Sequence, residues 1–316
     1  MKIFMKKIAY ISGMLLLISL ISFLAIHAAP NSFFGAGELN PNITPESIEK
    51  LKAVYGLDKP LTTQYFDWVV NILQLNFGIS FVSGADVSSE ILKRLPITLT
   101  INITAMFFVF VLSLYLGIKS ALNYGKKTDT AIKQLSLLSF SMPSFYLALL
   151  LIILFSVNFK LFPIAGLHSV DVDGEGFEYY LDMAWHLIQP ISIMIFGGLG
   201  SMIIYIRSLT LEILKSDYYY FALSRGLTQK QLLRYYLIPN LLPPIVTLLG
   251  LSLPGLIGGS VILESIFGID GMGQYFYMSA LSRDYPTIMG ILMISAFLTL
   301  LGNVVADLIL LKLNPY

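Results

Sequence analysis

Six long apolar segments decide what this chain of 316 residues can fold into. A helix needs roughly 20 apolar residues to cross the hydrocarbon core of a bilayer. The segments that meet or approach this length are 8–28, 95–118, 135–157, 187–206, 241–263 and 287–311. The sequence therefore predicts an all-α membrane protein with six transmembrane helices.

The composition supports a membrane protein. Hydrophobic residues make up 56% of the chain and charged residues 12%, whereas soluble domains carry about 25% charged residues. The net charge of +1 predicts neither a nucleic-acid partner nor an acidic ligand. The absence of cysteine excludes disulfides and thiolate chemistry. His27, His168 and His186 lie far apart without ligand spacing, so we expect no metal site.

The first apolar segment has two interpretations. Lys2, Lys6 and Lys7 precede it, as in a secretory signal peptide. Its length and the second apolar segment that follows favour a retained signal-anchor helix, and a cleaved signal peptide is the alternative.

The fourth segment, 187–206, is the least continuously apolar of the six. Gln189, Pro190 and three glycines interrupt its apolar run. Small residues are typical of close contacts between membrane helices, so we interpret the segment as a span packed tightly on a neighbour. A re-entrant or interior helix is the alternative.

The distribution of lysine and arginine predicts the orientation. Basic residues dominate the N-terminus, the loop 119–134 and the loop 207–240, whereas acidic residues dominate the loops 158–186 and 264–285. The first loop, 29–94, is too long for the rule to weigh strongly. Both termini and the loop 207–240 are therefore expected in the cytoplasm.

The first loop is expected to be an ordered, helical outer loop. Thr44, Pro45 and Gly56 have the types expected at the start and end of one helix. A second helix is expected over about 61–75, with Tyr65, Trp68, Val69 and Ile72 on one face. It could form a lid on the outer side or lie on the bilayer surface. Residues 1–94 then form an N-terminal part, and residues 95–316 form the main transmembrane domain.

The segment 217–239 is the most informative loop. A short helix from about Asp217 is expected to end at Gly226, and Thr228 with Gln231 predicts a capping box for a second helix that Pro239 closes. Exposed aromatic and apolar side chains usually mark a protein contact. Packing of this loop against the chain's own helix ends is an equally good interpretation of its composition.

The same segment resembles the cytoplasmic signature of permeases in binding-protein-dependent ABC importers. That signature reads Glu-Ala-Ala, three residues, Gly, nine residues, Ile-x-Leu-Pro. Ala222, Gly226 and Pro239 match at the required spacing, and Tyr220 with Phe221 replaces the leading Glu-Ala, which is frequent in the peptide and nickel branch.

Further segments are similar to the dipeptide, oligopeptide and nickel permeases, so that the resemblance covers residues 6–315. They are residues 55–61, 64–65, 76–80, 140–143, 264–268, 271–273 and 283–286. One departure is the C-terminus, which reads Asn314-Pro315-Tyr316 where the family often has Asp-Pro-Arg.

The resemblance implies a type I ABC importer transmembrane domain in the bacterial inner membrane. Its coupling helix, at about 217–239, would contact a cytosolic ATPase. The residues implied in coupling are Tyr220, Phe221, Ala222, Arg225, Gly226, Leu227 and Pro239. The implied partners are a second homologous permease, two cytosolic ATPase subunits and an extracytoplasmic substrate-binding protein.

No catalytic residue or cofactor site is expected in this chain. The phosphate-cradling pattern Gly-x4-Gly-Lys-Ser/Thr is absent, so ATP would be used by the partner ATPases. The sequence names no substrate-binding residue. Small peptides are favoured slightly over nickel or a nickel chelate.

Two other classes of function compete with the importer. A stand-alone channel or ion-coupled carrier needs charged sites inside its spans, and an intramembrane enzyme needs a catalytic constellation there. The apolar segments carry almost no ionisable residue apart from Asp307, near the end of the last segment, and no such constellation is visible.

Overall fold

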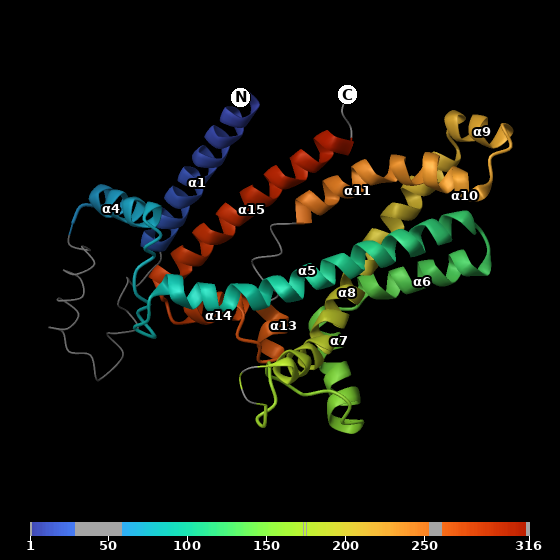
Figure 1. Cartoon of the computed structure of the whole chain (residues 1–316). Helices are drawn as coiled ribbons and strands as arrows, with labels where there is room; N and C mark the ends of the chain where they lie inside the picture. The colour runs from blue at the N-terminus through green and yellow to red at the C-terminus, as the bar shows by residue number, and fades with distance from the viewer. Residues whose placement is uncertain (1, 29–58, 173, 175, 253–260, 314–316) are drawn as a thin grey trace. The chain divides into compact units, whose positions relative to one another are not determined.

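The computed structural model describes residues 2–28, 59–172, 174, 176–252 and 261–313 (Figure 1). Within these ranges the regular structure is helical, apart from one isolated bridge between Ile79 and Asp86. The expected helix near 44–56 lies outside the described residues.

The described helices follow one another along the whole chain. In order they are α1 (Lys2–Ala28), α4 (Leu61–Leu73), α5 (Val87–Leu122), α6 (Lys127–Ser141), α7 (Ser144–Leu151), η1 (Ile152–Asn158), α8 (Phe177–Leu214), α9 (Asp217–Ser224), α10 (Gln229–Leu232), η2 (Leu233–Leu237), α11 (Ile238–Ser252), α13 (Val261–Ile266), α14 (Met272–Leu281) and α15 (Tyr285–Leu313). The elements η1 and η2 are π-helical turns.

Four described helices are long and apolar enough to cross a membrane, and a bent pair makes a fifth candidate. The four are Val87–Leu122, Phe177–Leu214, Gln229–Gly250 and Tyr285–Leu308. They include the predicted segments 95–118 and 187–206, the first part of 241–263 and most of 287–311. In α1 the described apolar stretch, Ala9–Ala25, is shorter.

The prediction of one helix over 135–157 is wrong. Helix α6 ends at Ser141, and the pair α6 and α7–η1 is bent by 98° (Figure 1). The cause is local, because Pro143 disfavours helical torsions at the residue before it. Met142 accordingly has φ −85° and ψ 120°, and Pro143 itself has φ −60° and ψ 131°.

The chain divides into two compact units, Met1–Ile97 with Gly271–Leu301, and Thr98–Asp270 with Gly302–Tyr316. In the first unit, α4 packs on α1. The hydroxyl groups of Ser19 and Tyr65 are hydrogen-bonded at 2.8 Å. The predicted face of α4 is half-buried, which confirms the expected helix, while Phe66, Val70 and Leu73 stay exposed on another face.

In the second unit, helices α6 and α8 cross with their backbones in contact. A Cβ atom built on Gly200 would lie 2.5 Å from the carbonyl oxygen of Ser136 and 2.9 Å from the backbone nitrogen of Phe140. The hydroxyl of Ser139 accepts a hydrogen bond from the Gly200 N–H at 2.9 Å and donates one to the carbonyl oxygen of Phe196. Gly200, and Gly198 against Val109, thus serve the tight packing that the sequence predicts, whereas a Cβ on Gly197 would meet no atom within 4 Å.

Candidate functional site

Residues 217–237 form a helical hairpin, called here the α9–α10 hairpin, that projects from the end of α8 (Figure 1). Helix α9 ends at Ser224, and the N–H of Gly226 then donates to the carbonyl of Leu223 at 3.0 Å. Gly226 has φ +77°, a left-handed conformation that side chains with a Cβ rarely adopt. The predicted end of the first short helix is confirmed.

The second helix of the hairpin begins with the predicted capping box. The side chain of Gln231 accepts a hydrogen bond from the Thr228 N–H at 2.9 Å, and the Gln231 N–H donates to the Thr228 hydroxyl at 3.4 Å. Two backbone donors at a helix start are thereby satisfied by side chains within the same turn. The shape of the hairpin therefore depends on residues that are close together in sequence.

One face of the α9–α10 hairpin is packed on the chain itself. Tyr219, Ala222, Leu232 and Leu237 are buried in a cluster with residues of α8 and α11. Leu227 packs against the same cluster. Burial raises the pKa of the Tyr219 hydroxyl above its usual value. The packed face fixes the hairpin to the helix that carries it.

The other face of the hairpin is open and rich in aromatic side chains. Tyr218, Tyr220, Phe221 and Leu223 are between 43% and 59% exposed. The guanidinium of Arg225 lies 4.3 Å from the centre of the Phe221 ring, a cation–π contact that holds a positive charge on this surface. Packing against the chain's own helices is thus confirmed for one face, and a protein contact on the open face stays a prediction.

The predicted end of the second helix at Pro239 is wrong. The helix continues from Gln229 to Gly250, and Pro239 is an exposed residue in its middle. The π-helical turn at Leu233–Leu237 lies immediately before it. A π turn interrupts the regular i−4 hydrogen bonds, and proline, which has no N–H, is accommodated where that ladder is already broken.

The predicted coupling residues lie on both faces of the hairpin, in its turn and outside it. Tyr220, Phe221 and Arg225 lie on the open face, Ala222 and Leu227 contribute to the packed face, Gly226 forms the turn and Pro239 lies outside the hairpin. Tyr218 and Leu223 belong to the open face as well, although they lie outside the predicted set. The position of Tyr218, three residues before Phe221 on the same helix, could have indicated its place on this face, whereas no helical spacing from Phe221 indicates Leu223.

A buried ion pair, missed from sequence, anchors α8 shortly before the hairpin. Arg207 donates two hydrogen bonds to the carboxylate of Asp129, at 2.8 and 2.9 Å. The same carboxylate accepts hydrogen bonds from the Ser120 hydroxyl at 2.6 Å and the Gly125 N–H at 3.0 Å. The side chain of Asp129 is fully buried. The sequence signal that could have indicated this ion pair is Asp129 itself, the acidic residue of the basic loop 119–134.

Two of the short segments that carry the family resemblance, 76–80 and 283–286, meet in the first unit. The buried carboxylate of Asp284 accepts hydrogen bonds from the Ser80 hydroxyl at 2.5 Å and the Phe81 N–H at 3.0 Å. The Thr287 hydroxyl donates to the same carboxylate at 2.8 Å. These residues therefore hold the segment around Ser80 against the start of α15.

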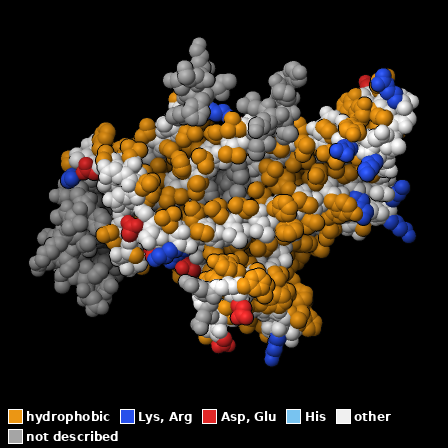
Figure 2. Space-filling model, in the orientation of Figure 1, with side chains coloured by type: hydrophobic (Ala, Val, Ile, Leu, Met, Phe, Trp, Pro, Cys, Tyr) orange, Lys and Arg blue, Asp and Glu red, His pale blue; other side chains and the backbone are white. Residues whose placement is uncertain are grey.

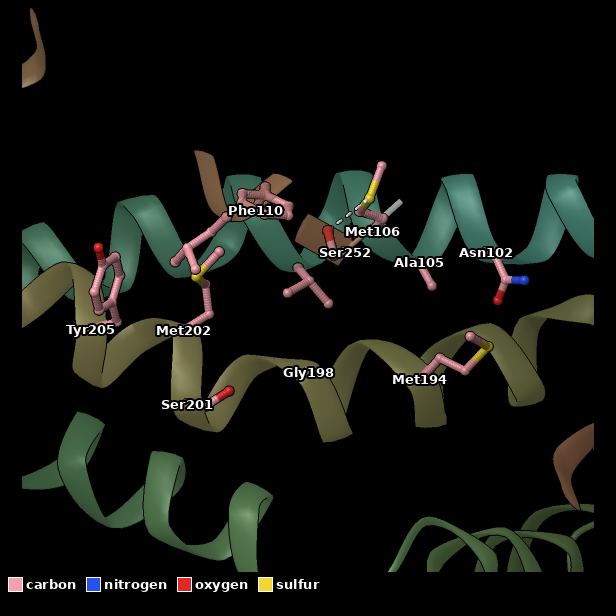
Figure 3. Close-up of a pocket in the computed structure, with 12 residues that line it drawn as sticks. Asn102, Ala105, Met106, Phe110, Met194, Gly198, Ser201, Met202, Tyr205 and Ser252 are labelled. Atoms are coloured by element: carbon pink, nitrogen blue, oxygen red, sulfur yellow. Dashed lines mark hydrogen bonds between the residues drawn. The ribbon is translucent and has the colours of Figure 1, made fainter. Parts of the chain in front are cut away.

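The second unit also contains a cavity of about 590 Å³ between α5, α8 and α11 (Figure 3). No Asp, Glu, Lys, Arg or His lines it. Figure 2 shows hydrophobic side chains over much of the visible surface, with Lys and Arg around the α9–α10 hairpin. Exposed basic residues there and on the turn between α5 and α6 include Arg225, Lys230, Lys126 and Lys127.

These features define a helical membrane protein that carries a protruding hairpin with one face packed and one face open. Comparison with known proteins makes the class specific. The family described as "Binding-protein-dependent transport system inner membrane component" matches residues 109–315, and its N-terminal companion family matches residues 1–102. The chain belongs to this family of ABC importer permeases.

Full-length relatives carry names from two groups of importers. The oligopeptide transport system permease protein AppB of Bacillus subtilis is 34% identical over 95% of this chain and 94% of its own length. The dipeptide permease DppB of Lactococcus lactis is 31% identical over 99% and 98%. The metal-staphylopine import permease CntB of Staphylococcus aureus is 31% identical over 99% and 97%.

A solved structure shows the same fold. A chain of the MetNI methionine ABC transporter, in an inward-facing conformation, aligns with a TM-score of 0.54 and 19% identity. The alignment covers 71% of this chain and 96% of the MetNI chain. The expected ABC importer fold is therefore confirmed at the level of the transmembrane domain.

Proposed function

We propose that this chain is a transmembrane permease subunit of an ATP-driven importer that moves small peptides across the bacterial inner membrane. The observation that carries the proposal is the full-length similarity to oligopeptide and dipeptide permeases. The open face of the α9–α10 hairpin supports it, because an exposed aromatic surface of this kind is typical of a protein contact.

We infer six spans with both termini in the cytoplasm. The α9–α10 hairpin and the turn between α5 and α6 then lie in the cytoplasm as well, in agreement with their exposed lysines and arginines. The Asp129–Arg207 ion pair supports a common side for these two segments, since it joins the start of α6 to α8 near the base of the hairpin.

In the proposed complex the hairpin is the coupling element. Tyr220, Phe221 and Arg225 contact a groove of a cytosolic ATPase, and Gly226 allows the tight turn that presents them. Ala222 and Leu227 transmit movement of the hairpin to α8 and α11 through the buried cluster. A second homologous permease, two ATPase subunits and an extracytoplasmic binding protein complete the importer, and ATP is used by the ATPases.

Import of a metal chelate is the second candidate, and the similarity to CntB favours it. A free metal ion fits less well. No group of three or more His, Asp or Glu residues within the described ranges is placed to hold a metal. The cavity is also mostly apolar. Peptides remain the proposed substrate, because relatives from both the oligopeptide and dipeptide systems match over the full length.

Uptake in a strain that lacks this chain tests the proposal. A labelled dipeptide and labelled nickel, free or chelated, are supplied to the strain with and without the wild-type chain, and co-purification of an ATPase is measured in parallel. Restored dipeptide uptake with ATPase co-purification is the expected result. Restored nickel uptake alone favours the metal candidate, and restoration of neither would falsify the substrate assignment.

A further inference from the structure

The cavity between α5, α8 and α11 has the size of a small-molecule site. Its volume of about 590 Å³ lies within the range of about 300–1,000 Å³ that is typical of such sites. Figure 3 shows Asn102 and Ala105 of α5 and Met202 and Tyr205 of α8 in the space between the two helices. All of its lining residues belong to the second unit, so this chain forms the cavity by itself.

The apolar part of the lining is unusually adaptable. The cavity is lined by Met106 and Phe110 of α5, Met194 and Met202 of α8, and Leu248 of α11. A methionine side chain is unbranched and polarizable, so it can fit apolar groups of different shapes. A surface of this kind suits a ligand whose side chains vary from one molecule to the next.

The polar part of the lining offers hydrogen bonds without charge. Ser201 and Tyr205 lie one turn apart on α8, and both line the cavity. Their hydroxyls make no hydrogen bond to the portion of the chain that the structure describes. Each hydroxyl can donate and accept, which matches the N–H and C=O groups of a peptide that must exchange water for other partners.

We propose that this cavity is a substrate-contact site for uncharged peptide segments, with the hydroxyls on backbone amides and the methionines on apolar side chains. The proposal rests on the proposed function and specifies the substrate class of the same transporter. A lipid acyl chain has no hydrogen-bond donor or acceptor for the two hydroxyl groups. A charged peptide side chain is disfavoured, since no residue of opposite charge lines the cavity.

The cavity is connected to the hairpin through one helix. Ser201 and Met202 follow Gly200, where Ser139 contacts both the N–H of residue 200 and the carbonyl of residue 196. A side chain inserted at this point of the hydrogen-bond ladder is a common cause of bending in helices. Bending of α8 here would change the wall of the cavity and the position of the α9–α10 hairpin together.

The test places a charge in the cavity and measures selectivity. Ser201→Asp is compared with Ser201→Asn, which has nearly the same size and no charge. Ser201 is exposed, so the added carboxylate keeps contact with solvent. Uptake of labelled Ala-Lys, Ala-Glu and Ala-Leu is measured in cells with the complete importer. A control places the same charge at Thr247, which is exposed on α11 outside the cavity.

The expected result is a ratio of Ala-Lys to Ala-Glu uptake about tenfold higher in Ser201→Asp than in Ser201→Asn, since opposite charges at contact distance attract strongly even in a partly solvated site. Thr247→Asp should keep the wild-type ratio. An unchanged ratio in Ser201→Asp, with Ala-Leu uptake intact, overturns the cavity assignment and leaves the importer function standing. Peptide uptake that does not depend on the chain overturns both.

A second measurement covers a variant that fails to assemble. Membranes with the wild-type importer are exposed to a photoreactive dipeptide that contains p-benzoylphenylalanine, and the cross-linked residues are mapped by mass spectrometry. Labels on the cavity residues of α5, α8 and α11 support the proposal. Labels only elsewhere on the chain contradict it.

Discussion

Two glycines three residues apart on α8 should respond in opposite ways to the same substitution. A Cβ on Gly197 meets no other atom within 4 Å, whereas a Cβ on Gly200 would lie 2.5 Å from the Ser136 carbonyl oxygen and 2.9 Å from the Phe140 nitrogen. Both contacts of Gly200 are with backbone, which cannot turn away as a flexible side chain can. Gly197→Ala and Gly200→Ala are therefore a matched pair.

The expected magnitudes follow from these surroundings. Alanine within a helix is more favourable than glycine by about 0.5–1 kcal/mol, so Gly197→Ala should stabilise the protein by that amount. In Gly200→Ala the same gain is outweighed, because overpacking in a tight contact costs about 1–3 kcal/mol. Separation of α6 from α8 would also weaken the Gly200 N–H bond to Ser139, now 2.9 Å long. A net loss of about 1–2 kcal/mol is expected.

Unfolding of the purified protein in detergent, followed by circular dichroism, measures both variants on one scale. Ser136→Ala is a useful control at the same crossing, because the Ser136 hydroxyl bonds within its own helix to Ile132. It should change the stability little. Equal shifts of Gly197→Ala and Gly200→Ala in the same direction would refute the idea that α6 and α8 touch through their backbones.

Three further predictions concern the hairpin and its anchor. Asp129→Ala should destabilise the protein by about 3–5 kcal/mol in the same unfolding assay, since Arg207 then keeps a largely buried charge without its partner; a change below 1 kcal/mol would contradict this. Phe221→Ala should leave stability within about 0.5 kcal/mol because the ring is exposed, yet weaken ATPase co-purification at least fivefold; unchanged ATPase recovery argues against the open face as the contact. Gly226→Trp should permit membrane insertion but abolish uptake, because Gly226 has φ +77° and a bulky side chain there disturbs the turn; normal uptake would remove the coupling role.

The hairpin shows how far local sequence can carry a prediction. The capping box of Thr228 and Gln231 and the glycine turn before it involve neighbouring residues, and the structure contains both. The wrong end at Pro239 has the opposite origin. Whether a proline stops a helix depends on the hydrogen bonds of the turn before it, and here that turn is π-helical at Leu233–Leu237.

The sequence by itself determined the class of this protein. The sequence shows apolar segments of bilayer length and the capping and turn residues of the hairpin directly. Both features depend on residues that are close together in sequence, because hydrophobic burial in lipid and helix capping act within one segment. The tertiary structure decided what the segments hold together. Asp129 and Arg207 lie 78 residues apart, Ser139 and Gly200 lie 61 apart, and Ser80 and Asp284 lie 204 apart. Such pairs, and the cavity between three helices, exist only once segments far apart in sequence have been brought side by side.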